Sequence, residues 1–180
     1  WVLRTACAQV RKWQDAGWRD LRVSVNLSAR QFQDINVSEL LSRTLKETGL
    51  SPTFLEVEIT ESTAMHRVQD TIVLLKELKK TGLRIAIDDF GTGYSSLEYL
   101  KNFPVDALKL DKSFVADLTR DASDAAIAAT VISLTHNLGM KMIAEGVETK
   151  EQFEFLRSKG CELAQGYLFS RPLPAPELQS

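Results

Sequence analysis

Short apolar runs rich in β-branched residues alternate along the chain with longer segments in which apolar residues recur every three or four positions. The first pattern is typical of buried strands and the second of amphipathic helices. The predicted strands are Arg22 to Leu27, Phe54 to Thr60, Arg84 to Asp88, Ala107 to Leu110, Lys141 to Ala144 and Glu162 to Ala164. The predicted helices are Val2 to Gln14, Val37 to Thr48, Val68 to Thr81, Ser95 to Asn102, Ser123 to Asn137 and Thr149 to Lys159. Glycines that commonly end a helix follow four of them, at Gly49, Gly82, Gly139 and Gly160.

This regular alternation predicts an α/β protein with a parallel sheet of βα units. Six βα units do not close an eightfold (β/α) barrel, which typically takes about 250 residues. The expected fold is therefore a TIM-like barrel that is truncated at the N-terminus by about two strands. No change in composition and no Gly/Ser-rich linker divides the chain, so residues 1–180 are expected to form one domain.

Polar side chains follow the predicted strands. The run from Ile87 to Leu97 contains two adjacent acids, Asp88 and Asp89, and then a Gly-x-Gly turn. Such a turn lets the backbone approach a cation or a phosphate closely, although an acidic loop in solvent has the same sequence pattern. Similar clusters follow the other strands, at Asn26 with Ser28, Glu58 with Glu61, Lys109 with Asp111, Glu145 with Glu148, and Gln165 with Tyr167.

Residues two apart in a strand share a face, so Glu56 with Glu58 and Lys109 with Asp111 are expected to point into the barrel. Buried charges must be paired or bound to a metal. An ion-pair network around Lys109 is one interpretation. A metal site is favoured because the acids outnumber the lysine and because sites of this fold lie where the strands end. Side-chain oxygens are the ligands that Mg²⁺ or Mn²⁺ prefers. The residues that could supply them are Asn26, Glu58, Asp88, Asp89 and Glu145.

Composition excludes several classes of partner. A net charge of −2 gives no basic field, so no DNA or RNA partner is expected. No apolar run approaches the roughly 20 residues that cross a bilayer, so no membrane contact by this segment is expected. Cys7 and Cys161 are too few for a disulfide framework. A cytoplasmic location is expected, which leaves room for a membrane anchor elsewhere in a longer parent protein.

Six ordered blocks make the chain resemble the EAL-domain cyclic-di-GMP phosphodiesterases. The blocks, which span essentially the whole chain, are Asn26-Leu27-Ser28, Glu58-Ile59-Thr60-Glu61-Ser62, Asp88 to Leu97, Lys109 to Phe114, Ala144 to Thr149 and Gln165-Gly166-Tyr167. The Glu-Ala-Leu signature that names the family is absent from this sequence and is expected upstream of Trp1. Without the glutamate of that signature, which resembles a metal ligand, little activity is expected of the 180-residue chain by itself.

The resemblance implies a modified TIM barrel that hydrolyses cyclic-di-GMP to linear pGpG in bacterial second-messenger signalling, with two Mg²⁺ or Mn²⁺ ions. It implies metal ligands at Asn26, Glu58, Asp88 and Asp89. It implies catalytic roles, around the activated water, for Lys109, Glu145, Asp89 and Gln165. Glu61 resembles a residue that stabilises the loop after Asp89, although its local sequence equally fits an exposed acid at a helix start. The weaker candidates, which adjoin these blocks, are Asp111, Glu148 and Arg30.

Two other functions stay open. A catalytically inactive receptor that binds cyclic-di-GMP is disfavoured, because degenerate members of the family lose metal ligands and this chain keeps all those in its span. An aldolase with Lys109 as the Schiff-base nucleophile is disfavoured, because a neutral lysine is hard to maintain among carboxylates. The resemblance also implies a homodimer formed through the helix after the Asp88-Asp89 loop.

Overall fold

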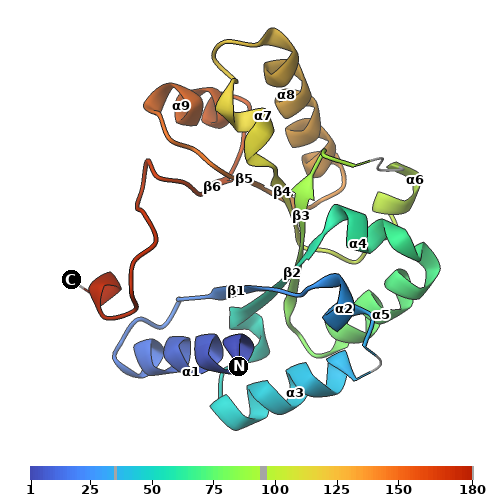
Figure 1. Cartoon of the computed structure of the whole chain (residues 1–180), viewed down its shortest axis with the longest axis vertical. Helices are drawn as coiled ribbons and strands as arrows, with labels where there is room; N and C mark the ends of the chain where they lie inside the picture. The colour runs from blue at the N-terminus through green and yellow to red at the C-terminus, as the bar shows by residue number, and fades with distance from the viewer. Residues whose placement is uncertain (35, 94–96, 180) are drawn as a thin grey trace. The chain divides into compact units, whose positions relative to one another are not determined.

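The strands of the protein form one sheet in which they are neighbours in chain order (Figure 1). The structure is a computed structural model that describes residues 1–34, 36–93 and 97–179. Pairing is parallel between β1 and β2, between β4 and β5, and between β5 and β6, as the alternating pattern predicts. The six strands are β1 (Val23–Asn26), β2 (Leu55–Thr60), β3 (Arg84–Phe90), β4 (Ala107–Leu110), β5 (Lys141–Ala144) and β6 (Leu163–Ala164).

The long helices agree with the predicted ones to within a residue at each end. They are α1 (Val2–Asp15), α3 (Val37–Thr48), α5 (Val68–Lys80), α8 (Ala122–Asn137) and α9 (Lys150–Ser158). The helix predicted to end at Asn102 ends at Leu100, in α6 (Leu97–Leu100); its predicted start at Ser95 lies outside the described ranges. Two 3₁₀ turns complete the described elements, η1 (Pro52–Phe54) and η2 (Glu177–Gln179).

Three short helices, which the sequence pattern did not predict, begin within three residues after a strand. They are α2 (Ala29–Phe32), α4 (Glu61–His66) and α7 (Lys112–Ala116). Each begins at a side-chain cap, in which an oxygen of Ser28, Thr60 or Asp111 accepts a backbone N–H of the first turn. The helices are too short to show a 3.6-residue period. The capping residues were the only local signal for them.

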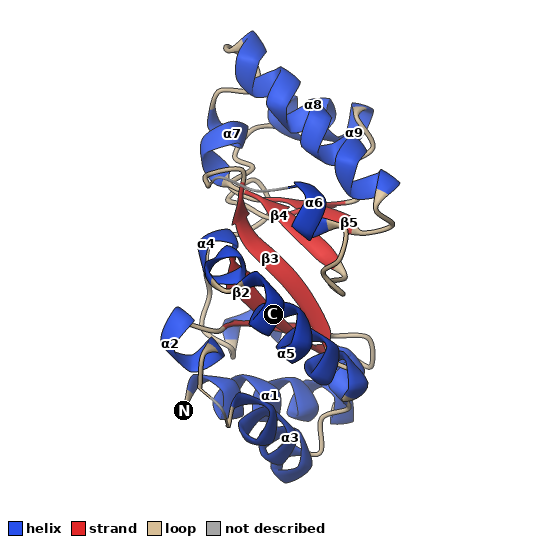
Figure 2. Ribbon diagram, turned by 90° about the vertical axis from the view of Figure 1, so that its right-hand side faces the viewer, coloured by secondary structure: helices blue, strands red, loops and turns tan. Residues whose placement is uncertain are grey.

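The chain divides into two compact units. The first is Trp1–Ala86 with Ser96–Val105, and the second is Ile87–Ser95 with Asp106–Ser180. In the first unit α1 lies beside α3 and packs on β1 (Figure 2). Buried apolar side chains, among them Cys7, Leu41 and Leu45, fill this layer. The burial follows from the amphipathic spacing of the two helices.

Polar side chains link the strands of the first unit. Ser24 Oγ donates to Glu56 Oε1 at 3.0 Å, and Arg84 Nε donates to Glu56 Oε2 at 3.3 Å. The Glu56 carboxylate is therefore buried together with a charged partner, as a buried acid requires. The strand register places Glu58 opposite Asn26, two residues further toward the strand ends.

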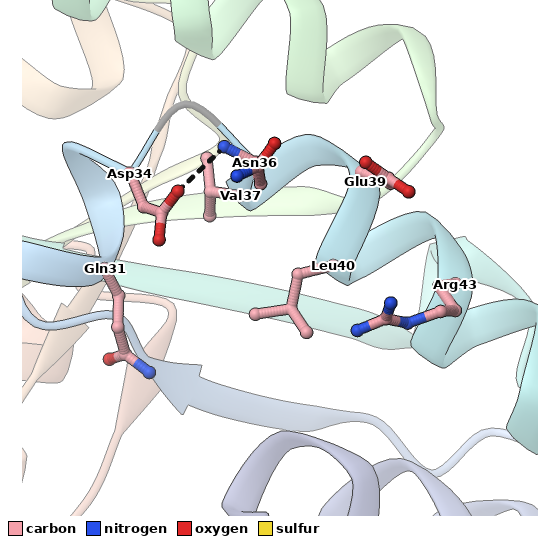
Figure 3. A pocket seen from close by; sticks show the side chains of 7 residues that line it. All are labelled: Gln31, Asp34, Asn36, Val37, Glu39, Leu40 and Arg43. Atoms are coloured by element: carbon pink, nitrogen blue, oxygen red, sulfur yellow. Dashed lines mark hydrogen bonds between the residues drawn. The ribbon is translucent and has the colours of Figure 1, made fainter.

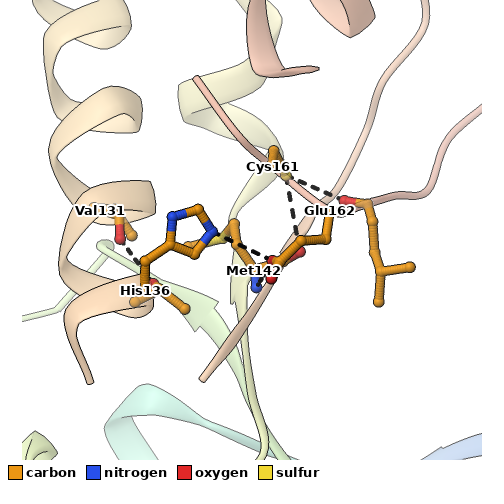
Figure 4. Close-up of polar contacts among 7 residues, drawn as sticks. Val131, His136, Met142, Cys161 and Glu162 are labelled. Carbon is orange, nitrogen blue, oxygen red and sulfur yellow. Dashed lines mark hydrogen bonds and ion pairs between the residues drawn. The ribbon is translucent and has the colours of Figure 1, made fainter. Parts of the chain in front are cut away.

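In the second unit α8 packs on β4 and β5, and α7 packs on α8. The C-terminal end of α8 is linked to β5 through Glu162, whose Oε2 accepts the Met142 N–H at 2.9 Å and lies 3.5 Å from His136 Nε2 (Figure 4). Cys7 and Cys161 are both free thiols. Burial raises the pKa of the Cys161 thiol to about 11, so this thiol stays protonated at neutral pH.

Among the described residues, every helix is too short or too polar to pass through a bilayer.

Candidate metal centre

An acidic cluster lies at the strand ends of the second unit. Asp88 and Asp89 are near the end of β3, and Glu145 follows β5 directly. One carboxylate oxygen from each of the three lies within 4.8 Å of the other two. Asp88 is only 8% exposed, and the other two acids are half-buried. Carboxylates gathered this closely repel one another unless a cation lies among them.

Lys109 supplies one such cation. This residue of β4 is 4% exposed, and its Nζ lies 3.1 Å from Asp88 Oδ1 and 2.7 Å from Glu145 Oε1. The ion-pair network that the sequence left open is thus present. The three carboxylates of the cluster, however, carry more negative charge than the Lys109 ammonium balances. A divalent cation would balance the remaining acidic charge, so the ion pairs and a metal site are compatible.

The backbone at Asp89 explains how two adjacent acids join one cluster. In a regular strand their side chains would point to opposite faces. Asp89 has a φ of +54°, the one positive value for a non-glycine residue in the described chain, and Gly91 follows with a φ of +101°. The Asp89 N–H donates to Asp88 Oδ1 at 3.0 Å. This left-handed step, which residues other than glycine rarely adopt, ends the strand alternation at Asp89.

The electrostatic environment disfavours a negative charge on Asp89. Burial raises the pKa of its carboxyl group, and the charges of Asp88 and Asp111 raise this pKa further; Lys109 and Lys112 oppose the shift. A bound cation would relieve this unfavourable environment. The cluster therefore has the electrostatics of a cation site.

Asp111 has a different role. Burial acts to raise the pKa of its carboxyl group, but hydrogen bonds from the Ser113 hydroxyl and N–H, with the charge of Lys112, overcome this effect and lower the pKa. Its Oδ1 accepts the Ser113 N–H at 2.9 Å at the start of α7. The residue predicted as a weaker site candidate thus caps a helix.

This cap predicts a pH-dependent contribution to stability. Replacing Asp111 with alanine is expected to cost about 1 kcal/mol of unfolding free energy at neutral pH. Because the folded pKa is lowered, the contribution is present above the unfolded value of about 3.9 and is lost as the pH falls through the folded pKa. Urea unfolding of wild type and Asp111→Ala at several pH values measures this contribution. If the difference in unfolding free energy stayed constant down to the lowest pH at which the protein folds, Asp111 would not act as a charged helix cap.

The predicted site residues of the first unit lie at the ends of β1 and β2. Asn26 is exposed and pairs in register with Glu58, which is 5% exposed. Glu61 is the first residue of α4 and is 1% exposed. The interpretation of Glu61 as an exposed helix acid is therefore wrong. The polar turn after β2 folds back as α4 and buries this side chain, which a local sequence pattern does not reveal.

The remaining candidates lie in loops and helix ends. Gln165 is exposed, and its backbone holds the loop after β5, because its N–H donates to Ala144 O at 2.8 Å and its carbonyl accepts the Val147 N–H at 3.0 Å. Glu148 is exposed and precedes the Thr149 cap of α9. Arg30 is exposed in the short helix α2.

A separate hollow of about 450 Å³ lies between α2 and α3 in the first unit (Figure 3). Its lining carries both signs of charge, from Asp34, Glu39 and Arg43. Gln31 also lines it, although the Gln31 Oε1 already accepts the Ser28 N–H at 3.1 Å. This mixed lining is unlike the acidic cluster and does not indicate a metal site.

One buried residue of the second unit was missed by the sequence analysis. Gln152 is 6% exposed, and its side chain forms hydrogen bonds both to the end of α7 and to the loop before α9. Its spacing from Thr149 is that of a capping box, which was the available signal.

The EAL domain family model matches residues 1–172. The cyclic di-GMP phosphodiesterase NbdA of Pseudomonas aeruginosa is 46% identical over 179 residues, which are 99% of this chain and 23% of NbdA. The MucR phosphodiesterase of the same organism, solved as a c-di-GMP complex, superposes with a TM-score of 0.97 at 46% identity and covers 99% of this chain and 72% of that one.

A manganese and cyclic-di-GMP complex of BlrP1 from Klebsiella pneumoniae is 34% identical, with a TM-score of 0.84, over 94% of this chain and 43% of that one. These likenesses confirm the predicted fold class. The chain spans about a quarter of the length of the curated relatives, 23% of NbdA and 26% of MucR.

Proposed function

Because this chain belongs to the EAL domain family, we propose that it is a phosphodiesterase domain that hydrolyses cyclic-di-GMP to linear pGpG with Mg²⁺ or Mn²⁺ in bacterial signalling. The observation that carries the proposal is the cluster of Asp88, Asp89 and Glu145 around the Lys109 ammonium. The phosphodiesterase names of NbdA and MucR support the substrate.

The donor set fits a hard divalent cation. Carboxylate oxygens within 4.8 Å of one another suit Mg²⁺ or Mn²⁺. The pKa of Asp89 is raised first by burial and then by the charges of Asp88 and Asp111, and a cation would offset both effects. Asp88 and Asp89 would hold the metal. Asn26 and Glu58 are proposed as further ligands from their matching motif positions alone. Bound metal would supply Lewis-acid stabilisation of a phosphoryl group and a water of lowered pKa.

The protein's own groups then orient the reaction. Lys109 Nζ forms ion pairs with two carboxylates, and its proposed role is to stabilise negative charge on a phosphate or to orient the attacking water. Glu145 fixes that ammonium group through its ion pair at 2.7 Å. The two ion pairs favour the charged form of Lys109, which argues against the aldolase interpretation because a Schiff base forms from a neutral amine.

Other parts of the proposal rest on the motif matches. Gln165 is proposed to support the catalytic groups, and Glu61 to stabilise the loop after Asp89; its burial supports a structural task. The chain is proposed to form one domain, because the family match spans both compact units. A homodimer is proposed from the resemblance. The weaker candidates Glu148 and Arg30 receive no role.

Incubation of the full-length gene product with cyclic-di-GMP and Mn²⁺, followed by chromatography, tests the function. Linear pGpG is the expected product. Ca²⁺ is expected to inhibit, because its longer and more variable coordination misplaces the reacting water. Binding of cyclic-di-GMP without product, with either Mg²⁺ or Mn²⁺, would favour the receptor interpretation. Absence of both binding and hydrolysis would contradict the proposal.

A further inference from the structure

The one-turn helix α7 follows directly after the strand that carries Lys109 (yellow in Figure 1). The side chain of Asp111 caps α7, and the Asp111 N–H donates to Phe90 O at 3.4 Å. Three contacts connect α7 with the two segments that carry the acidic cluster. None of them involves a carboxylate of the cluster itself.

The first contact is at Gly91, in the turn after Asp89. A Cβ atom at this position would lie 2.8 Å from Cε2 of Phe114. That distance is shorter than any ordinary carbon contact, so the backbone of the turn lies directly against the Phe114 ring. The turn after Asp89 therefore contacts α7 through the Phe114 ring.

The second contact is at Gly146, immediately after Glu145. A Cβ atom here would lie 2.6 Å from Cβ of Lys112 and 3.4 Å from its Cα. Both Lys112 atoms are close to the backbone and cannot rotate away. The loop that presents Glu145 thus packs against the first turn of α7 with no space for a side chain.

The third contact is the buried side chain of Gln152. Its Nε2 donates to Ala116 O at the end of α7 at 3.1 Å. Its Oε1 accepts the N–H groups of Glu148 at 2.8 Å and Thr149 at 2.9 Å. One amide group therefore joins α7 to the loop that follows Glu145.

We propose that α7 is the positioning element of the acidic cluster, with Gly146 and Gln152 as the positioning residues that set the place of Glu145 relative to Asp88 and Asp89. The inference rests on the proposed function in that the cluster is taken to bind a divalent cation. Divalent cations demand narrow ligand geometry, and loss of supporting contacts around ligands typically costs about 10- to 100-fold in metal affinity. Contacts outside the cluster should therefore control its affinity.

The test compares Gly146→Ala with Gly139→Ala in the full-length gene product. The two glycines have φ values of +68° and +71°, so alanine meets the same backbone strain at both. Gly139 has nothing within 4 Å of an added Cβ, whereas Gly146 has Lys112. The proteins are titrated with Mn²⁺ alone, and binding is monitored by electron paramagnetic resonance. The Mn²⁺ affinity should be at least tenfold weaker than wild type for Gly146→Ala and within about twofold of wild type for Gly139→Ala. Equal affinities for all three proteins would overturn the proposal.

A second substitution in the Gly146→Ala background separates positioning from general instability. Lys112→Gly removes the Cβ atom that the new methyl group meets, and is expected to restore most of the Mn²⁺ affinity. Lys112→Ala removes the same ammonium group but keeps that Cβ, and is expected to restore none. Equal behaviour of the two double variants would contradict the steric cause.

If Gly146→Ala does not fold, Gln152→Glu tests the same proposal through the third contact. A glutamate keeps oxygen acceptors for the Glu148 and Thr149 N–H groups but cannot donate to Ala116 O. Mn²⁺ affinity about tenfold weaker is expected, and affinity equal to wild type would overturn the proposal. Wild type that binds Mn²⁺ but hydrolyses no cyclic-di-GMP would refute the proposed function alone. Wild type with no measurable Mn²⁺ binding would overturn the positioning proposal as well.

Discussion

Replacing Asp88 or Asp89 with asparagine is expected to lower turnover of cyclic-di-GMP at least about a hundredfold while the fold persists. Asparagine keeps the volume of the side chain and removes the negative charge. Asp88→Asn leaves Lys109 paired with Glu145 at 2.7 Å, so the lysine keeps an acidic partner. The loss should therefore fall on the reaction rather than on folding.

Asp89→Asn should also stabilise the metal-free protein. The pKa of Asp89 is raised by burial and by neighbouring acids, so its charged form is disfavoured in the folded state. The gain in unfolding free energy is expected at neutral pH. It should vanish as the pH falls below the ordinary carboxyl pKa of about 3.9. Asp20→Asn, in an exposed loop of the first unit, is the matched control. Normal hydrolysis by both cluster variants would show that neither acid takes part in the reaction.

Replacing Lys109 with methionine is expected to abolish most turnover and to destabilise the metal-free protein by about 3–5 kcal/mol, the cost of breaking a buried ion pair. The substitution leaves Asp88 and Glu145 without the ammonium that lies 3.1 and 2.7 Å from them. Saturating Mn²⁺ should recover part of the lost stability, because a cation bound among the carboxylates supplies positive charge. It should not recover turnover.

Urea unfolding with and without Mn²⁺ measures both effects of Lys109→Met. Lys150→Met removes an exposed lysine at the start of α9 and should change neither stability nor turnover. If Lys109→Met had the unfolding free energy of wild type and still hydrolysed cyclic-di-GMP, the lysine would have no part in the site. If Mn²⁺ gave it no stability, the carboxylates around it would not form a cation site.

The sequence was sufficient for the strands and for the long helices, because helices such as α1 and α3 span several turns and show their apolar period. It was insufficient for α4 and α7, which have six and five residues. A helix of one or two turns leaves no periodic signal. Its cap is visible in the sequence but also fits an ordinary turn.

The location of the site at the strand ends followed from the positions of the acids in the sequence. The pairing of Lys109 with both Asp88 and Glu145 did not, because residues more than 20 positions apart meet only through the sheet. The roles of Gly146 and Gln152 were equally hidden. Close approach to α7 is a tertiary contact, and a glycine after a strand looks the same in sequence whether or not another backbone lies against it.

The rate of cyclic-di-GMP hydrolysis against free Mn²⁺ concentration, measured after exhaustive chelation, tests most directly whether the acidic cluster is a catalytic metal centre. The rate is expected to be undetectable without metal and to rise to saturation when Mn²⁺ or Mg²⁺ is restored. Full hydrolysis by the chelated, metal-free protein would contradict the account.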